Sequence, residues 1–338
     1  AMTRRLSLAG PLLLGAILFV FALGPLIALV VRSLVLDRAA LVAELTTPAS
    51  IAALFGTLQV ALGAAFLALV AGTPLTLLAY RTDLPGRDWL PTVLALPSAV
   101  PPFIVAMGWI TLANPTTGLL NRMLETLGIP ALNAYSTAFI ALVQGTAGLP
   151  LVVLAGGAAL KRLDPALEEA ARLSGAGPMR TLRDVTLPLV LPSLLAAAGL
   201  VFLATSAAFG VPYILGTAAT PPVPVLTTRI YALLQVGGDA TTAGAMGLGT
   251  MLLSLAALAQ WTSLKFGERG RVKLLSGKGV ADRPIALGRM GSGLAVFAWG
   301  LVGGLVVLPL VAVFLASVQE RPGGPLFDWT FVHWASVL

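Results

Sequence analysis

Between two strongly apolar stretches lies Glu169-Ala170-Ala171-Arg172-Leu173-Ser174-Gly175, and after nine more residues comes Val185-Thr186-Leu187-Pro188. Asp164 can cap a helix whose first residue, Pro165, needs no N–H partner, so a short helix is predicted to begin at about residue 165. The run Gly175-Ala176-Gly177-Pro178 is predicted to end it and to open another, because Gly tolerates the left-handed conformation of a helix C-terminus and Pro suits a first turn. The segment therefore predicts two short helices joined by a tight corner.

The composition around this segment is that of a membrane protein. Hydrophobic residues make up 57% and charged residues 10% of the chain, and the mean hydropathy is +0.94, whereas soluble domains carry about 25% charged residues. Stretches long enough to cross about 30 Å of hydrocarbon as helices occur at residues 8–31, 51–80, 89–113, 134–160, 188–210, 244–264 and 290–317. We therefore expect an all-α integral membrane protein with about seven transmembrane helices.

The distribution of basic residues predicts the orientation. If the N-terminus lies inside, sixteen Lys and Arg residues fall in inner segments and five in outer ones, which agrees with the enrichment of basic residues in cytoplasmic loops. The N-terminus and the loop 161–188 are then cytoplasmic. The net charge of +7 reflects this topology and contact with anionic lipid, and it implies no nucleic-acid partner.

Several kinds of chemical site are excluded by the residue types. The chain has no cysteine and one histidine, His333, so disulfide frameworks and Cys/His metal sites are ruled out, and His333 is interpreted as an interfacial residue. The run Ser276-Gly277-Lys278-Gly279 lacks the Gly five residues before Gly277 that a phosphate-binding loop requires. Neither a catalytic nor a metal site is expected, and the energy for any transport must come from a partner.

The spacing in the opening segment resembles a known docking loop. Written as E-A-A-x3-G-x9-[IV]-x-L-P, it is similar to the cytoplasmic loop by which permease subunits of binding-protein-dependent ABC importers contact their ATPase. The resemblance implies a MetI-like, type I importer core. In it, Glu169 contacts the rim of the ATPase socket, Ala170 and Ala171 allow a close fit, and Gly175 makes the corner. The residues that it assigns to the coupling loop are Glu168, Glu169, Ala170, Ala171, Gly175, Gly177, Leu187 and Pro188.

Other stretches extend the resemblance to the fused permeases of the iron(III) importer group. They are Arg81–Arg87, Gly108–Ile110, Phe209–Pro212 and Val225–Tyr231. This implies iron(III) as the cargo, while thiamine, polyamine and phosphonate permeases share the architecture and stay open as alternatives. An ion-coupled secondary transporter is a more distant alternative, although such proteins commonly keep ionisable groups within the membrane. A membrane scaffold is another.

An internal repeat suggests the domain organisation. Pro25-Leu26-Ile27-Ala28-Leu29 is echoed 284 residues later by Pro309-Leu310-Val311-Ala312-Val313. We therefore expect a first helix and outer loop over 1–50 and a five-helix permease core over 51–264 with the coupling loop 161–188. A basic cytoplasmic linker over 265–289 and the first helix of a second, truncated permease unit over 290–338 follow.

Polar residues within the spans are few. The candidates for a translocation pathway are Thr57, Gln59, Ser98, Gln144, Thr205 and Ser206. Pro97, Pro101, Pro102 and Pro150 are expected to bend their helices, and the glycines of the spans to serve helix packing.

By resemblance, the chain is a non-enzymatic subunit in the bacterial inner membrane. Its implied partners are a cytoplasmic ABC ATPase dimer that binds ATP and Mg²⁺, a periplasmic binding protein, a second permease half, fused or separate, and membrane lipid.

Overall fold

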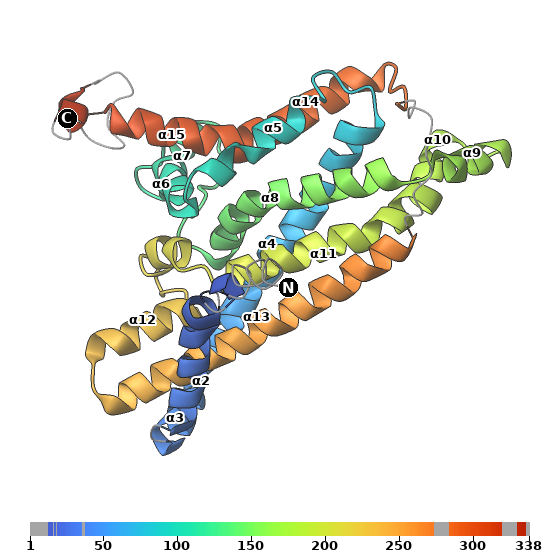
Figure 1. Ribbon diagram of the computed structural model, residues 1–338. Coiled ribbons are helices and arrows are strands. Elements are labelled where there is room, and N and C mark those ends of the chain that lie inside the picture. Colours follow the sequence, from blue (N-terminus) through green and yellow to red (C-terminus); the bar gives the residue numbers. More distant parts are fainter. Residues whose placement is uncertain are drawn as a thin grey trace, which may run out of the picture. The chain divides into compact units, whose positions relative to one another are not determined.

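The computed structural model describes residues 13–15, 17, 19–35, 38–273, 284–319 and 330–335. Every named element within these residues is helical (Figure 1), and an isolated β-bridge joins Thr82 to Ile285. The chain divides into two compact units. Unit 1 comprises residues 1–56 and 224–255, unit 2 comprises 57–223 and 256–338, and the long helices α4 (Pro48–Arg81) and α13 (Asp239–Lys273) contribute to both.

Unit 1 contains short helices packed against the ends of the two long ones. Besides parts of α4 and α13 it holds η1 (Phe19–Leu23), α2 (Gly24–Val35), α3 (Arg38–Leu45) and α12 (Leu226–Val236). Its core is formed by buried Ala53, Leu226, Leu233, Ala245 and Leu248.

One ion pair links α3 to α12 in this unit. Arg229 Nη2 lies 2.7 Å from Glu44 Oε1, which also accepts a hydrogen bond from Ser50 Oγ at 2.8 Å. Glu44 in turn packs against Gly244, where an added Cβ would lie 2.7 Å from Glu44 Cγ. Gly244 therefore serves packing, as the sequence predicts.

Unit 2 holds the remaining elements. They are α5 (Leu90–Ala95), η2 (Leu96–Ala99), α6 (Pro102–Ala113), α7 (Leu119–Thr126), α8 (Thr137–Arg162), α9 (Pro165–Leu173), α10 (Pro178–Thr181), η3 (Leu182–Thr186), α11 (Leu187–Ser206), η4 (Pro212–Gly216), α14 (Met290–Val302), η5 (Gly303–Val307), α15 (Leu308–Ser317) and α16 (Val332–Ala335).

Small residues bring α4, α8 and α11 close together. A Cβ added at Gly72 of α4 would lie 2.8 Å from the Val152 side chain of α8, and one added at Gly148 of α8 would lie 2.6 Å from Val201 of α11. Helices in lipid gain little from hydrophobic burial against one another, so such close approach supplies the packing contacts instead. The predicted packing role of these glycines is confirmed.

The membrane spans lie where the sequence predicts them, apart from a break in the third and an earlier start of the fifth. Helices long and apolar enough to cross a bilayer are Leu13–Val31, Pro48–Arg81, Thr137–Arg162, Pro178–Ser206, Asp239–Arg269 and Met290–Ser317. The predicted crossing helix over 89–113 is instead two pieces, Leu90–Ala99 and Pro102–Ala113, at 100° to each other.

The break has a local cause. Val100 precedes Pro101 and adopts an extended conformation (φ −117°, ψ 132°), as residues before proline usually do, and Pro102 then opens α6. The bend predicted at Pro101 and Pro102 is thus confirmed, and it is sharp enough to break the span into two helices. Pro97 lies within η2. Pro150 lies inside α8.

Two other boundaries differ from expectation. The fifth span begins at Pro178 rather than 188, because η3 joins α10 to α11 without a gap. Leu187 and Pro188, which the sequence assigns to the coupling loop, therefore lie within a continuous helical stretch. Helix α13 runs to Lys273, so the first part of the predicted linker 265–289 is helical. Residues 274–283, including Ser276–Gly279, lie outside the described residues.

The C-terminal segment 284–319 packs within unit 2. Ile285 N donates a hydrogen bond to Arg81 O (2.8 Å), and Leu287 N donates one to Asp83 Oδ1 (2.8 Å). Helix α15 packs against α6, where a Cβ added at Gly108 would lie 2.1 Å from the carbonyl oxygen of Pro309. The repeat that begins near residue 290 stays a prediction, but its first helix is integrated into the same compact unit as 57–223.

Candidate functional site

Helices α9 and α10 form a tight elbow at one end of unit 2 (Figure 1). Asp164 Oδ1 accepts a hydrogen bond from Ala166 N at 2.9 Å and caps α9, which opens with Pro165. Gly175 has a φ of +86°, and the next residue, Ala176, donates its N–H back to Ala171 O at 3.0 Å. This is the Schellman arrangement that ends a helix at a glycine. The predicted helix, corner and second helix are confirmed.

A buried ion-pair cluster fastens the elbow to the ends of three long helices. Glu168 of α9 is 5% exposed, and its Oε1 accepts a hydrogen bond from Thr186 Oγ1 at 2.6 Å. The same oxygen lies 3.5 Å from Arg81 Nη2 at the end of α4, and Nη2 also donates to Leu160 O of α8 at 3.2 Å. Arg172 Nη2 lies 3.8 Å from the second carboxylate oxygen of Glu168. The cluster thus joins α9 to α4, α8 and the start of the fifth span.

The coupling-loop candidates consequently have different environments. The Glu168 side chain faces inward and holds the elbow in place, so it offers no exposed contact. Glu169 and Ala170 lie on the exposed side of α9, Ala171 is half-buried, Gly175 and Gly177 are exposed at the corner, Leu187 is half-buried and Pro188 is exposed.

Two large apolar side chains that the sequence analysis did not single out dominate the exposed face. Leu173 at the end of α9 is 90% exposed and Met179 in α10 is 75% exposed. Around them lie Arg180 and Arg183, both largely exposed and both near Asp184, at 3.5 Å and 3.8 Å. An apolar centre with a charged rim is typical of a protein contact surface. The sequence alone does not separate Leu173 and Met179 from other apolar residues of the loop such as Leu182, so only the structure reveals their exposure.

Arg81 and Thr186 were not predicted as members of this site either. Arg81 ends a long apolar helix and resembles any basic residue at a membrane boundary, and Thr186 occupies a variable position of the docking pattern. Their roles follow from contacts between residues 18 and 87 positions away from Glu168 in the chain. Only the fold reveals these contacts.

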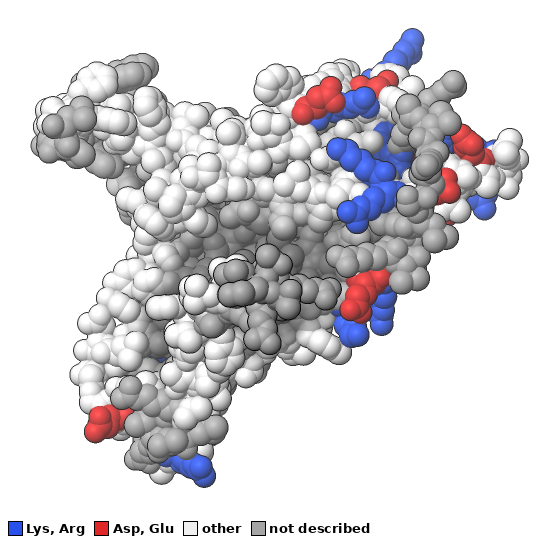
Figure 2. Space-filling model, in the orientation of Figure 1, with Lys and Arg blue, Asp and Glu red and all other residues white. Residues whose placement is uncertain are grey.

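Charged side chains gather at the same end of unit 2. Figure 2 shows Lys, Arg, Asp and Glu over the end that carries α9 and α10, while the visible surface along the helices of this unit is white or grey. An uncharged belt with charges at its end suits a helix bundle that crosses hydrocarbon. The assignment of this end to the cytoplasmic side stays a prediction.

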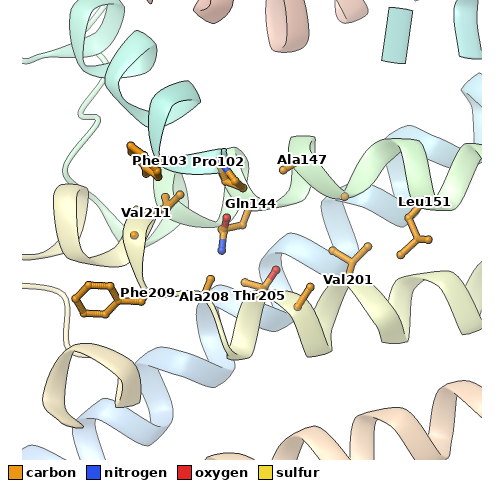
Figure 3. Close-up of a pocket in the computed structure, with 13 residues that line it drawn as sticks. Pro102, Phe103, Gln144, Ala147, Leu151, Val201, Thr205, Ala208, Phe209 and Val211 are labelled. Carbon is orange, nitrogen blue, oxygen red and sulfur yellow. The ribbon is translucent and has the colours of Figure 1, made fainter. Parts of the chain in front are cut away.

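A cavity of about 360 Å³ lies between α6, α8 and α11 of unit 2 (Figure 3). Its walls are mostly apolar and include Phe103, Val201 and Phe209, and two polar side chains, Gln144 and Thr205, face it. No residue in its described lining is charged.

The structure therefore brings together two of the six pathway candidates. Gln144 and Thr205 line the cavity, whereas Thr57 is buried away from it, Gln59 and Ser98 are exposed elsewhere, and Ser206 donates a hydrogen bond to Phe202 O at 2.8 Å. The His333 side chain lies outside what the structure describes.

The chain matches one protein family over more than half its length. The family model described as "Binding-protein-dependent transport system inner membrane component" matches residues 72–264. The match runs from the last part of α4 into α13 and includes the elbow and the cavity.

Two curated relatives illustrate the similarity. The putative 2-aminoethylphosphonate transport system permease protein PhnU of Salmonella typhimurium is 30% identical over 209 residues, which cover 61% of this chain and 72% of the relative. The molybdenum transport system permease protein ModB of Mycobacterium tuberculosis is 30% identical over 241 residues, covering 71% of this chain and 87% of the relative. Neither relative is named for iron.

A solved structure supports the fold. A bacterial alginate ABC transporter, solved in complex with its alginate pentasaccharide-bound periplasmic protein, contains a chain that superposes with a TM-score of 0.61 at 22% sequence identity, covering 82% of this chain and 98% of that chain. The predicted all-α membrane fold with a MetI-like permease core is confirmed.

Proposed function

Because the chain belongs to the family of binding-protein-dependent transport system inner membrane components, we propose that it forms one half of a pore through which an ATP-driven importer passes a small oxyanion. The membership itself makes the chain a multi-pass permease of the inner membrane and a transport component rather than an enzyme. The observation that carries the proposal further is the elbow, which is rigidly anchored on one side and exposes apolar side chains on the other.

The exposed face of the elbow fits a socket on a cytoplasmic ABC ATPase. Burying Leu173 and Met179 against a partner would contribute about 1.5–3 kcal/mol for each side chain, and Glu169, Arg180 and Arg183 would make polar contacts around them. The small side chain of Ala170 allows the partner to approach the helix backbone. ATP and Mg²⁺ would bind to the ATPase dimer, since this chain supplies the docking surface only.

The anchored side of the elbow explains how a movement would reach the pore. Glu168 joins α9 to Arg81 at the end of α4 and to Thr186 before α11. When the ATPase dimer closes, it would displace the elbow as one piece and pull the ends of these helices with it. The pore would then alternate between inward-open and outward-open states, with the N-terminus on the ATPase side.

The cargo is proposed from the relatives. The resemblance to fused permeases favours iron(III), but PhnU and ModB are named for 2-aminoethylphosphonate and molybdenum. The compound 2-aminoethylphosphonate carries a phosphonate group, and molybdenum dissolves in neutral water as the oxyanion molybdate. We therefore place an oxyanion ahead of ferric iron, with a periplasmic binding protein to select it and a second permease half, fused or separate, to complete the pore.

Uptake and co-purification with the ATPase test this function together. Gly175→Val, which forces a side chain onto a φ of +86°, should abolish ATPase co-purification and uptake while membrane insertion stays normal. Gly293→Val is the matched control, because this glycine lies in α14 outside the elbow and an added Cβ would meet nothing within 4 Å. Normal co-purification and uptake in Gly175→Val would contradict the coupling role.

The cargo is tested separately with the unaltered transporter. Reconstituted with its binding protein, it should take up 2-aminoethylphosphonate or molybdate when ATP is supplied. Uptake of ferric iron alone would contradict the oxyanion proposal and restore the expectation from sequence.

A further inference from the structure

The cavity between α6, α8 and α11 contains two polar side chains with no hydrogen-bond partner. Gln144 and Thr205 are each only 6% exposed, and within the described part of the chain neither side chain makes a hydrogen bond. By contrast, the neighbouring hydroxyl of Thr146 donates to Val143 O at 2.8 Å. Because both side chains line the cavity and bond to no described protein group, their hydrogen-bonding groups are available to water or to a solute inside it.

Both side chains are aimed into the same space from different helices. In Figure 3 the Gln144 carboxamide points from α8 into the cavity towards α11, and the Thr205 hydroxyl points into it from α11. Apolar residues, among them Phe103, Val201 and Phe209, form the rest of the wall. The volume of about 360 Å³ is within the range of small-molecule sites.

The cavity lies far from the elbow along both helices. Gln144 is 18 residues before Arg162, the last residue of α8, and Thr205 is 18 residues after Leu187, the first of α11. At 1.5 Å per residue this is about 27 Å in each helix. Since the elbow is on the ATPase side, the two polar groups lie near the opposite mouth of the pore, where cargo would arrive from the binding protein.

We propose that Gln144 and Thr205 form a contact site that holds the oxyanion cargo as it enters the pore. The carboxamide N–H groups and the hydroxyl donate hydrogen bonds to cargo oxygens and replace part of the hydration shell. Because no charged residue lines the described cavity, the site binds weakly and lets the cargo leave. This inference rests on the proposed function, and it adds a place and two named donors for the cargo.

Thiol labelling tests whether the site is open and whether cargo occupies it. The chain contains no cysteine, so Gln144→Cys and Thr205→Cys each introduce one reporter. In the detergent-solubilised complete transporter, a small polar thiol reagent should modify both, and mass spectrometry of this chain gives the rates. Val143→Cys is the control, because this neighbour on α8 is 0% exposed and lies outside the cavity lining.

The expected result is rapid labelling at both cavity positions, little at the control, and at least severalfold slower labelling when 2-aminoethylphosphonate or molybdate is added with the binding protein. Labelling of Gln144→Cys and Thr205→Cys no faster than that of Val143→Cys would overturn the proposal. A labelling rate at these two positions that neither solute lowers would also overturn the proposal.

Uptake by near-isosteric variants gives a second and independent readout. Gln144→Leu and Thr205→Val should each lower the uptake rate by about two- to tenfold, the value of one hydrogen bond, while ATPase co-purification stays at the level of the unaltered chain. Unchanged uptake in both variants would overturn the contact site alone. Failure of the unaltered transporter to take up either solute would instead overturn the proposed cargo.

Discussion

The buried pair of Glu168 and Arg81 gives the sharpest prediction of the structure. Their residues are 5% and 4% exposed, and Thr186 supplies a further hydrogen bond to the carboxylate. In Glu168→Ala, Arg81 keeps its hydrogen bond to Leu160 O but loses the carboxylate as its buried counter-ion. Breaking a buried ion pair in this way costs about 3–5 kcal/mol.

The assay is thermal unfolding of the purified transporter, followed on this chain. At about 2 °C per kcal/mol, Glu168→Ala should lower the melting temperature by about 6–10 °C. The double variant Glu168→Leu with Arg81→Leu removes both charges and leaves apolar groups, so it should lose far less and can be neutral or stabilising. Glu169→Ala is the control on the exposed neighbour and should change stability by less than about 0.5 kcal/mol.

Two outcomes would refute this reasoning. One is a melting temperature for Glu168→Ala no lower than that of Glu169→Ala. The other is additive losses in the double variant, which would mean that the two side chains do not stabilise each other. If the pair transmits movement as proposed, the double variant should also retain ATPase co-purification but lose part of its uptake, because the elbow is then less firmly tied to α4.

Three further predictions follow from close contacts and exposed surfaces. Gly108→Val should release α15 from α6, because the added Cβ would meet the Pro309 carbonyl oxygen. Limited proteolysis should then cut the 284–319 segment faster than in the unaltered chain. Gly300→Ala, with open space around it, is the control, and equal cutting rates in the two variants would contradict the packing. Glu44→Gln should lower stability by about 1–2 kcal/mol through the partly buried contact with Arg229, measured by thermal unfolding, and no loss would show that the contact contributes nothing. Leu173→Asp should weaken ATPase co-purification at least tenfold with unchanged stability, because it places a charge on the apolar centre of the elbow. The control is Leu96→Asp, since Leu96 is also exposed but lies on η2 away from the elbow. This variant should leave co-purification unaltered.

The sequence predicted most of the local structure of the elbow, because local rules determine it. Asp164 caps α9, Pro165 and Pro178 open helices, and Gly175 ends one, all through contacts within a few residues. Glu168 was different. Its position near the start of α9 favours an interaction of the carboxylate with the positive end of the helix dipole. Its buried pairing with Arg81, however, depends on how α4 and α9 meet.

The spans were predicted from apolar length, and the prolines predicted a bend in the third span but not a complete break. Length cannot distinguish a straight helix from two pieces, and the 100° break before Pro102 depends on the extended conformation of Val100 and Pro101. Pathway residues were similarly hard to rank. Polarity selected six candidates, but only the packing of α8 against α11 shows that Gln144 and Thr205 share a cavity while Ser206, next to Thr205, bonds to its own helix.

The docking of the elbow on a cytoplasmic ATPase is tested most directly by cross-linking from one introduced thiol. Leu173 is 90% exposed at the centre of the proposed contact, and Leu173→Cys would introduce the only cysteine of the chain. In membranes that contain the complete transporter, a short thiol-reactive cross-linker should join this position to the ATPase, and an impermeant reagent outside intact cells should not label it. A Leu173→Cys thiol that yields no ATPase cross-link, or that is labelled from outside, would contradict the account.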